Sequence, residues 1–181
     1  MCRSVLLLPL LALIPATSCA PRAVQVGTGA ATPAEAEAVV RDAQGNVLGT
    51  LSLAQETMGI RITGSLVNVP AGVHGFHVHT AGRCEPPFTT AGGHWNPAGR
   101  QHGADNPNGK HQGDLPNLTA NAQGNVLVNV LLSGASIRAG TTPLIDADGA
   151  AFVVHAAADD YRTDPAGNAG ARIACGVVVA R

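Results

Sequence analysis

The chain has 181 residues, of which 45% are hydrophobic and 3% aromatic, and it contains 22 glycines and 12 prolines. One domain of ordinary size suits this length, and so many glycines and prolines with so few aromatic residues argue against a helical bundle. The formal net charge of −1 gives no electrostatic reason to expect a nucleic-acid partner.

The first 18 residues are typical of a secretory signal peptide, because their apolar run at 5–14 is too short to span a bilayer. The Ala-Thr-Ser-Cys that follows resembles a bacterial lipobox, in which Cys19 becomes the lipidated first residue of the mature protein. Ala16 stands where leucine is usual, so cleavage near Ala20 or Ala23 by an ordinary signal peptidase stays open. Both routes predict export.

The segment after the signal peptide is expected to be a tether. Residues 19–34 are rich in Pro, Ala, Gly and Thr and show no periodicity, which is typical of a flexible linker ahead of a folded domain at 35–181. We expect the protein in the periplasm or cell envelope, and a lipidated Cys19 would attach it to a membrane.

The even number of cysteines that remains after processing supports the interpretation that the protein is exported. Cys2 leaves with the signal peptide and Cys19 is assigned to processing, so Cys84 and Cys175 remain as one pair. We expect these two cysteines to form a disulfide, a bond that persists in oxidising compartments. In the chain-entropy model, closing a loop of this length stabilises the fold by about 4–5 kcal/mol.

From residue 35 onward, short apolar runs are separated by turn signals. The runs at 39–40 and 47–53 flank Asp-Ala-Gln-Gly-Asn, which predicts a hairpin, and residues 60–63 alternate with period two. Further strands are expected at 73–79, on the face shared by Val126, Val128, Val130 and Leu132, at 151–155 and at 173–180. About eight such strands predict an all-β, antiparallel sandwich or barrel.

Two segments lack this strand pattern. Residues 80–117 are rich in Gly, Pro, Asn and His, and residues 157–171 are rich in Asp and Gly. Loops of this length in a compact domain are usually functional, so we expect both to contribute to a site.

Histidines mark the first candidate site. On a strand, His77 and His79 point to the same side, so both rings can reach one ion while Val78 packs the other way. A His-x-His pair alone is a weak signal, because solvated or hydrogen-bonded histidines are more common. Further candidate ligands occur in the first long loop and at the end of a later strand: His94, His102, His111, Asp114 and His155.

The ligand types separate into two sets. Copper favours imidazole nitrogens in a tetragonal arrangement, whereas structural zinc takes a closed tetrahedral set of nitrogen and carboxylate oxygen. The strand-borne His77, His79 and His155 suit copper, and the loop-borne residues with Asp114 suit zinc. His94 could serve both ions.

Several motifs together resemble the exported bacterial copper/zinc superoxide dismutases over residues 35–181. They read HGFHVH (74–79), GGHWNPAGRQHG (92–103), HQGDLPN (111–117), VVHAAADD (153–160) and GNAGARIACGV (167–177). The resemblance implies an eight-stranded antiparallel Greek-key β-sandwich or barrel of immunoglobulin-like type, with two long functional loops. It also implies one copper and one zinc ion per chain.

Carried over by position, the family's ligands fall on residues of these motifs. The copper ligands would be His77, His79, His94 and His155. The zinc ligands would be His94, His102, His111 and Asp114, with the His94 imidazolate bridging the two ions. The disulfide loop and the second loop differ in length from those of animal members, so the animal enzymes' dimer interface and guidance charges do not transfer.

Residues around the ligands also receive roles from the resemblance. Asp159 would link His77 to His102, which fixes the orientation of both rings. His74 would be a hydrogen-bonding structural histidine rather than a ligand. Arg172 would receive the substrate anion beside copper, and the disulfide would hold its strand against the first long loop. Asp160 is more simply explained as a solvated charge of its loop. The same explanation is the simpler one for the positive residues that could guide the substrate to the site: Arg83, Arg100, Lys110 and Arg162.

The resemblance implies the dismutation of superoxide to dioxygen and hydrogen peroxide, which would protect the cell envelope. One alternative is an exported copper- and zinc-binding buffer or delivery domain without catalysis, which would need neither Arg172, Asp159 nor a shared His94. A zinc-stiffened adhesion sandwich would not explain four imidazoles arranged for copper. Monomer and homodimer both remain open.

Overall fold

The structure, a computed structural model, describes residues 35–181, so the expected signal peptide, Cys19 and the tether lie outside the described residues. Within the described part, the chain forms nine strands and one 3₁₀-helix. They are β1 (Ala36–Asp42), β2 (Val47–Glu56), β3 (Gly59–Leu66), β4 (Gly72–His74), β5 (Phe76–His79), η1 (Thr89–Ala91), β6 (Leu118–Ala120), β7 (Val126–Ser133), β8 (Ala151–His155) and β9 (Arg172–Ala180). The predicted all-β fold is confirmed. No helix of this part is long and apolar enough to cross a membrane.

The strand count differs from the expected eight because the run at 73–79 is divided at Gly75. The Gly75 N–H donates to Ala157 O at 2.8 Å, and its carbonyl accepts from His155 N at 2.9 Å. These bonds are made to the second loop and the end of β8. The chain therefore leaves its pairing with β6 as β4 and begins a new pairing with β8 as β5.

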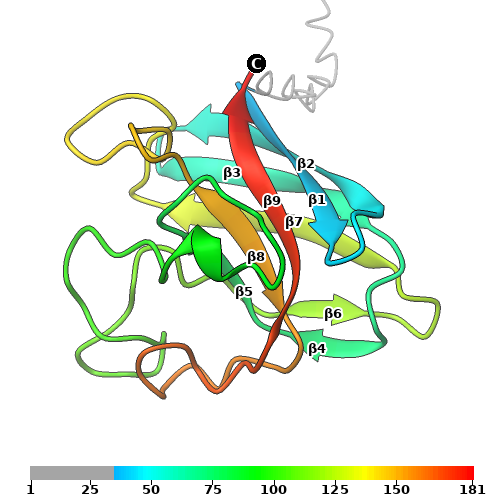
Figure 1. Cartoon of the computed structure of the whole chain (residues 1–181). Helices are drawn as coiled ribbons and strands as arrows, with labels where there is room; N and C mark the ends of the chain where they lie inside the picture. The colour runs from blue at the N-terminus through cyan, green and yellow to red at the C-terminus, as the bar shows by residue number, and fades with distance from the viewer. Residues whose placement is uncertain (1–34) are drawn as a thin grey trace, which may run out of the picture. The chain divides into compact units, whose positions relative to one another are not determined.

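Seven strands share one antiparallel sheet in the order β5-β8-β9-β1-β2-β3-β7, and β4 pairs with β6 in a second small sheet. Strands distant in sequence are neighbours: β9, the last strand, lies between β8 and β1. Figure 1 shows the larger sheet curling so that its two ends approach one another. The sheet places β5 and β8 side by side, and both long loops leave from this end of the order.

The core lies on the concave side of the curled sheet and is mostly aliphatic. The alternation expected for the seventh strand is confirmed, since Val126, Val128 and Leu132 are buried and Val130 packs against the same core. Two of the core's largest side chains, Phe76 of β5 and Phe152 of β8, stack with their ring centroids 5.4 Å apart.

The predicted turn and disulfide are both present. The Asp42 carboxylate accepts the backbone N–H groups of Gln44 at 2.9 Å and Asn46 at 2.8 Å, which closes the β1–β2 hairpin. Cys84 and Cys175 form a disulfide across 91 residues of sequence. This bond joins the first long loop to β9.

Replacing Phe152, which is fully buried, tests the core assignment. Phe152→Ala should lower the free energy of unfolding by about 3–5 kcal/mol, because it leaves a cavity and removes the contact with Phe76. Chemical denaturation with a chelator present measures this change. Leu127→Ala is the control, since Leu127 is 83% exposed, and it should change stability by less than about 0.5 kcal/mol. Equal losses in both variants would contradict the assignment.

Candidate metal centre

The strand β5 places two histidines on the side of the sheet opposite the core. Phe76 and Val78 pack in the main core, so the alternation of the strand turns His77 and His79 the other way. Both histidines are nevertheless fully buried, because the first long loop covers them. Isolated bridges join His77 to Asp114 and His79 to His94.

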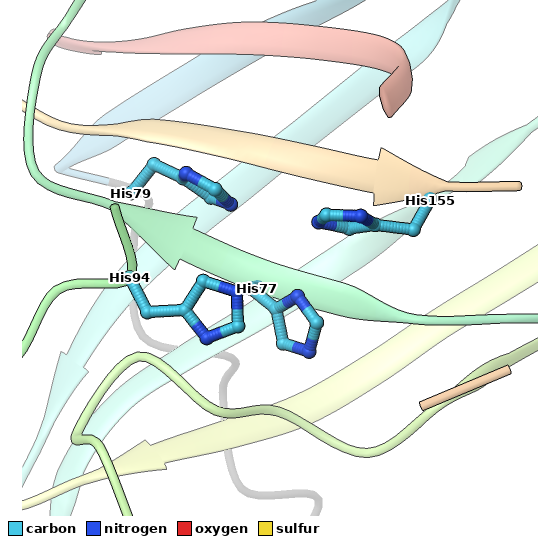
Figure 2. Close-up of side chains that lie close together, drawn as sticks. All are labelled: His77, His79, His94 and His155. Atoms are coloured by element: carbon cyan, nitrogen blue, oxygen red, sulfur yellow. The ribbon is translucent and has the colours of Figure 1, made fainter. Parts of the chain in front are cut away.

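Four histidines form the first group, which we call the copper-side group. It consists of His77, His79, His94 and His155, which each offer one ring nitrogen within 4.8 Å of those of the others. All four are buried, and Figure 2 shows the rings gathered beside β5 and β8. The ring centroids of His77 and His94 are 3.9 Å apart, and those of His77 and His155 are 4.8 Å apart.

The second group, the zinc-side group, consists of His94, His102, His111 and Asp114. The Asp114 Oδ1 atom lies 2.8 Å from His94 Nδ1, 3.1 Å from His102 Nδ1 and 3.2 Å from His111 Nδ1. Although His102 Nδ1 lies close to Asp114 Oδ1, no hydrogen bond joins the two atoms, and His102 Nδ1 has no other hydrogen-bond partner. The His94 ring belongs to both groups, with Nδ1 facing Asp114.

Several buried ring nitrogens in these groups lack a protein partner: Nδ1 of His77 and His102, and Nε2 of His79, His94 and His155. In all five of these rings the other nitrogen bonds to an oxygen, and for His94 this is Nδ1 with Asp114 Oδ1. His77 Nε2 donates to Asp159 Oδ2 at 2.7 Å and His102 Nε2 to Asp159 Oδ1 at 2.9 Å. His79 Nδ1 donates to Gly92 O at 2.9 Å, and His155 Nδ1 to Gly170 O at 3.2 Å.

These bonds fix where the ring protons lie. Carbonyl and carboxylate oxygens accept hydrogen bonds, so the bonded nitrogen of each ring carries a proton, and in the copper-side rings the other nitrogen keeps a lone pair. A buried acceptor left without a partner costs about 1–3 kcal/mol. Four of the five unpartnered nitrogens belong to the copper-side group, where a cation would be bound by all of them. In the zinc-side group, His102 Nδ1 is the unpartnered nitrogen, and it lies close to the Asp114 carboxylate. The residues therefore fit a copper ion in the first group and a zinc ion in the second.

Burial keeps the three strand-borne copper-side rings neutral. Burial lowers the pKa of His77 to about 4, of His155 to about 3 and of His79 to about 2. The nearby charge of Arg172 adds to the lowering at His79 and His155. Neutral imidazole is the form that binds a metal, so no proton has to be displaced from these rings at neutral pH.

In the zinc-side group, burial lowers the pKa of His111 as well, whereas His102 shows the opposite shift. Burial opposes a charge on His102, but the nearby carboxylate of Asp114 and the hydrogen-bonded carboxylate of Asp159 outweigh it and raise the pKa of His102 to about 9. Burial likewise opposes the ionised form of both carboxyls, yet the nearby charge of His102 and the hydrogen bonds that each carboxylate accepts hold the pKa of Asp114 and of Asp159 well below the usual range. The two carboxylates thus hold a positive charge at this position, and a metal ion can replace the proton on His102.

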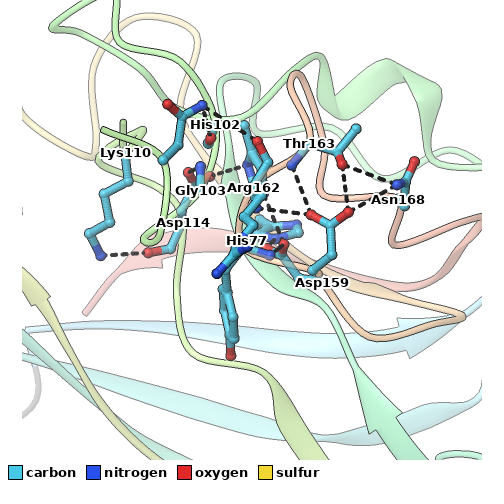
Figure 3. A network of polar contacts seen from close by, with 12 residues as sticks. His77, His102, Gly103, Lys110, Asp114, Asp159, Arg162, Thr163 and Asn168 are labelled. Atoms are coloured by element: carbon cyan, nitrogen blue, oxygen red, sulfur yellow. Dashed lines mark hydrogen bonds and ion pairs between the residues drawn. The ribbon is translucent and has the colours of Figure 1, made fainter. Parts of the chain in front are cut away.

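Asp159 connects the two groups. Its side chain is fully buried, and its two oxygens accept from His77 and His102, one from each group. Figure 3 shows Asp159 in a polar network that also contains His77 and His102. Because one carboxylate orients both rings, the positions of the two groups are mechanically coupled.

Arg172 lies at the start of β9, beside the copper-side group. Its guanidinium donates to Phe88 O at 2.6 Å and to Gly92 O at 2.7 Å. The Gly92 carbonyl also accepts from His79 Nδ1, so one oxygen atom joins the arginine to a copper-side histidine. Two carbonyls of the first long loop, which the disulfide ties to β9, therefore fix the guanidinium.

The remaining candidates lie outside both groups. His74 contacts His155 O at 2.8 Å and Pro70 O at 2.7 Å through its two ring nitrogens. The exposed Asp160 accepts from Thr163 and Asn168 within its own loop. The Lys110 Nζ atom donates to Asp114 O at 2.8 Å, so Lys110 contacts the zinc-side loop rather than solvent alone.

Sequence reasoning gave no role to Asn117 and Tyr161. The Asn117 side chain donates to Asp159 O and accepts from Asp159 N, both at 2.9 Å. Tyr161 N donates to Asp159 Oδ1 at 2.7 Å. The available signals were that Asn117 ends the HQGDLPN motif and that Tyr161, the single tyrosine, follows Asp159 by two residues.

Comparisons with known proteins agree with this geometry. Residues 47–178 match the family described as copper/zinc superoxide dismutase (SODC). The chain is 42% identical over 147 residues to superoxide dismutase (Cu-Zn) 2 of Aquifex aeolicus, covering 80% of this chain and 86% of that protein. It is 40% identical to superoxide dismutase (Cu-Zn) of Caulobacter vibrioides, with 79% and 84% covered.

Solved structures include the crystal structure of a SOD-like protein from Bacillus subtilis, with a TM-score of 0.76 and 38% identity over 79% of this chain and 97% of that one. The match to the family covers most of the described residues, and the named relatives align over most of their own length. The chain therefore belongs to the copper/zinc superoxide dismutase family of oxidoreductases.

Proposed function

We propose that this chain dismutates superoxide to dioxygen and hydrogen peroxide at a copper ion joined to a zinc ion through the His94 ring. The observation that carries the proposal is the set of buried ring nitrogens whose lone pairs converge without a protein partner. Copper would be held by His77, His79, His94 and His155, and zinc by His94, His102, His111 and Asp114. When bound, copper supplies the one-electron chemistry by alternating between two oxidation states.

The protein would contribute rigid positions for the copper-side rings. His77 and His79 lie on β5, which pairs with β8 along its whole length, and His155, which ends β8, pairs with Arg172 of β9. Their bonded nitrogens carry the ring protons, so the free nitrogens keep the orientation that a metal requires. A site built on strands holds its geometry more closely than one built on loops alone.

Arg172 would attract and align the substrate. Superoxide is a small anion, and a guanidinium fixed beside the copper-side group supplies a positive charge and hydrogen-bond donors at that place. His94 Nε2 faces the same group and is a nitrogen at which a proton can be held for the peroxide product. A metal buffer or delivery domain would have no use for Arg172 held in this way.

We also propose that the chain is exported to protect the cell envelope. Residues 1–18 would be the signal peptide, Cys19 the lipidated residue and residues 19–34 the tether, with the enzyme domain at 35–181. The lipobox-like sequence and the disulfide Cys84–Cys175, a bond typical of oxidising compartments, support this proposal.

Metal content and activity test the proposed reaction. The mature protein should contain one copper and one zinc ion per chain, measured by elemental analysis. Selective removal of copper should reduce superoxide dismutation to the uncatalysed level, and copper, but not added zinc, should restore it. Full activity after copper removal would exclude copper as the redox centre.

Replacement of the proposed anion-binding residue tests its role. Arg172→Ile should lower the rate constant for superoxide about tenfold at low ionic strength and flatten its dependence on salt, because one steering charge is lost. Stopped-flow or pulse-radiolysis kinetics over a salt series measure both effects. Arg61→Ile removes the same charge from the Arg61–Glu56 pair on the β2–β3 hairpin. If both variants showed the same salt dependence, Arg172 would have no special part in substrate attraction.

Lipid attachment is tested by substitution of Cys19. In cells, the unsubstituted chain should fractionate with membranes and Cys19→Ser should appear in the soluble envelope fraction, because the acylated residue is gone. Immunoblotting of fractions and mass spectrometry of the mature N-terminus measure this. An unmodified N-terminus at residue 20 or later in the unsubstituted chain would instead support ordinary signal-peptide cleavage.

A further inference from the structure

Tyr161 has an unusual backbone conformation. Its φ is 59°, in the left-handed region that a residue with a bulky side chain rarely adopts. Such a conformation is strained and persists only where surrounding contacts fix it. The contacts of Tyr161 therefore indicate what the strained conformation achieves.

Tyr161 closes a ring of hydrogen bonds with Asp159 and Asn117. Its backbone N–H donates to Asp159 Oδ1 at 2.7 Å, and its hydroxyl accepts from Asn117 N at 2.7 Å. The Asn117 side chain completes the ring with its two bonds to the Asp159 backbone. The carboxylate that orients His77 and His102 is thus fixed from its backbone and from its side chain.

The carbonyl of Tyr161 reaches a third segment. It accepts from Asp105 N at 3.0 Å. Gly103 lies against the same carbonyl, and a Cβ atom on Gly103 would come within 2.1 Å of the Tyr161 oxygen. Gly103 N in turn donates to Asp114 Oδ2 at 3.0 Å. Tyr161, which belongs to the second loop, therefore contacts two separate parts of the first loop. One is Gly103 and Asp105, near His102, and the other is Asn117, near Asp114.

The two metal groups depend on these loop contacts to different degrees. Three copper-side histidines belong to β5 and β8, whose ladder hydrogen bonds hold them. His102, His111 and Asp114 all lie between η1 and β6, where the described chain forms no strand. Contacts between loops must therefore supply the order that the sheet supplies on the copper side.

From these contacts we infer that Tyr161 is a positioning residue: its phenol and left-handed backbone lock the Asp159 carboxylate and the loop segments around the zinc-side group. The inference rests on the proposed zinc site and extends it to a residue that touches no ligand atom. It predicts that loss of the Tyr161 hydroxyl weakens zinc retention and leaves copper retention unchanged.

Tyr161→Phe is the most direct variant, because it keeps the ring and removes only the hydroxyl. Zinc release from the protein loaded with both metals should accelerate roughly three- to tenfold, below the 10–100-fold typical of losing a direct partner of a ligand. Release is followed with a chromogenic chelator, and copper retention by elemental analysis. Thr163→Val is the matched control: it removes a hydroxyl of the same loop that bonds Asp160 and Asn168 rather than Asp159.

Two results would overturn the inference. One is equal zinc release from Tyr161→Phe and Thr163→Val, and the other is equal acceleration of zinc and copper release in Tyr161→Phe, which would indicate general loosening. Dismutase activity does not enter either comparison. A chain that retains zinc through Tyr161 but lacks dismutation would therefore refute the proposed reaction and leave this inference standing.

A second measurement needs no substitution. The chain has one tyrosine, so 3-fluorotyrosine labels Tyr161 alone. Its ¹⁹F resonance should shift as zinc is added to the copper-free protein and should stop changing at one equivalent. A resonance that does not respond to zinc would contradict a connection between the phenol and the zinc-side group.

Discussion

Burying an imidazole lone pair without a donor is unfavourable, yet the described chain does so in all four rings of the copper-side group, within one small volume. Each costs about 1–3 kcal/mol unless a partner is present. The opposite nitrogens bond to carbonyl or carboxylate oxygens wherever the ring is strand-borne, which excludes turning the rings to relieve the cost. The sheet and the loops around the site keep these lone pairs directed at positions that cations can occupy.

The fold divides this task between the sheet and the loops. The sheet carries Phe76 and Val78 into the core and the alternating histidines to the other side, so core packing also fixes the copper-side rings. The loops complete the site through Asp159, whose oxygens join one ring of each group. Close packing is needed there: a Cβ atom on Gly167 would lie 1.9 Å from Asp159 Oδ1, and the φ of Gly167 is 63°. A larger residue at 167 would displace the carboxylate.

Much of this could be predicted from the sequence, where local patterns carry the information. Period-two alternation identified β7 and the run at 151–155 identified β8, because side-chain direction on a strand is a local property. Cysteine parity identified the disulfide. The division of 73–79 at Gly75 was not predicted, since it depends on bonds to Ala157 and His155 far along the chain.

Local sequence patterns could not predict the contacts within the loops either. The carbonyls that fix Arg172 belong to Phe88 and Gly92, and any residue type supplies a carbonyl, so no side-chain signal marks them. Asn117 and Tyr161 were missed for a related reason: their roles depend on hydrogen bonds between two loops that follow no period. The resemblance to a family indicated the ligands, but the structure was required to see what positions them.

Anomalous X-ray scattering from crystals of the metal-loaded chain, recorded at the copper and zinc absorption edges, tests the central claim most directly. The account predicts a copper peak among His77, His79 and His155 and a separate zinc peak among His102, His111 and Asp114, with the His94 ring between them. A single peak, or a copper peak away from the β5 histidines, would contradict it.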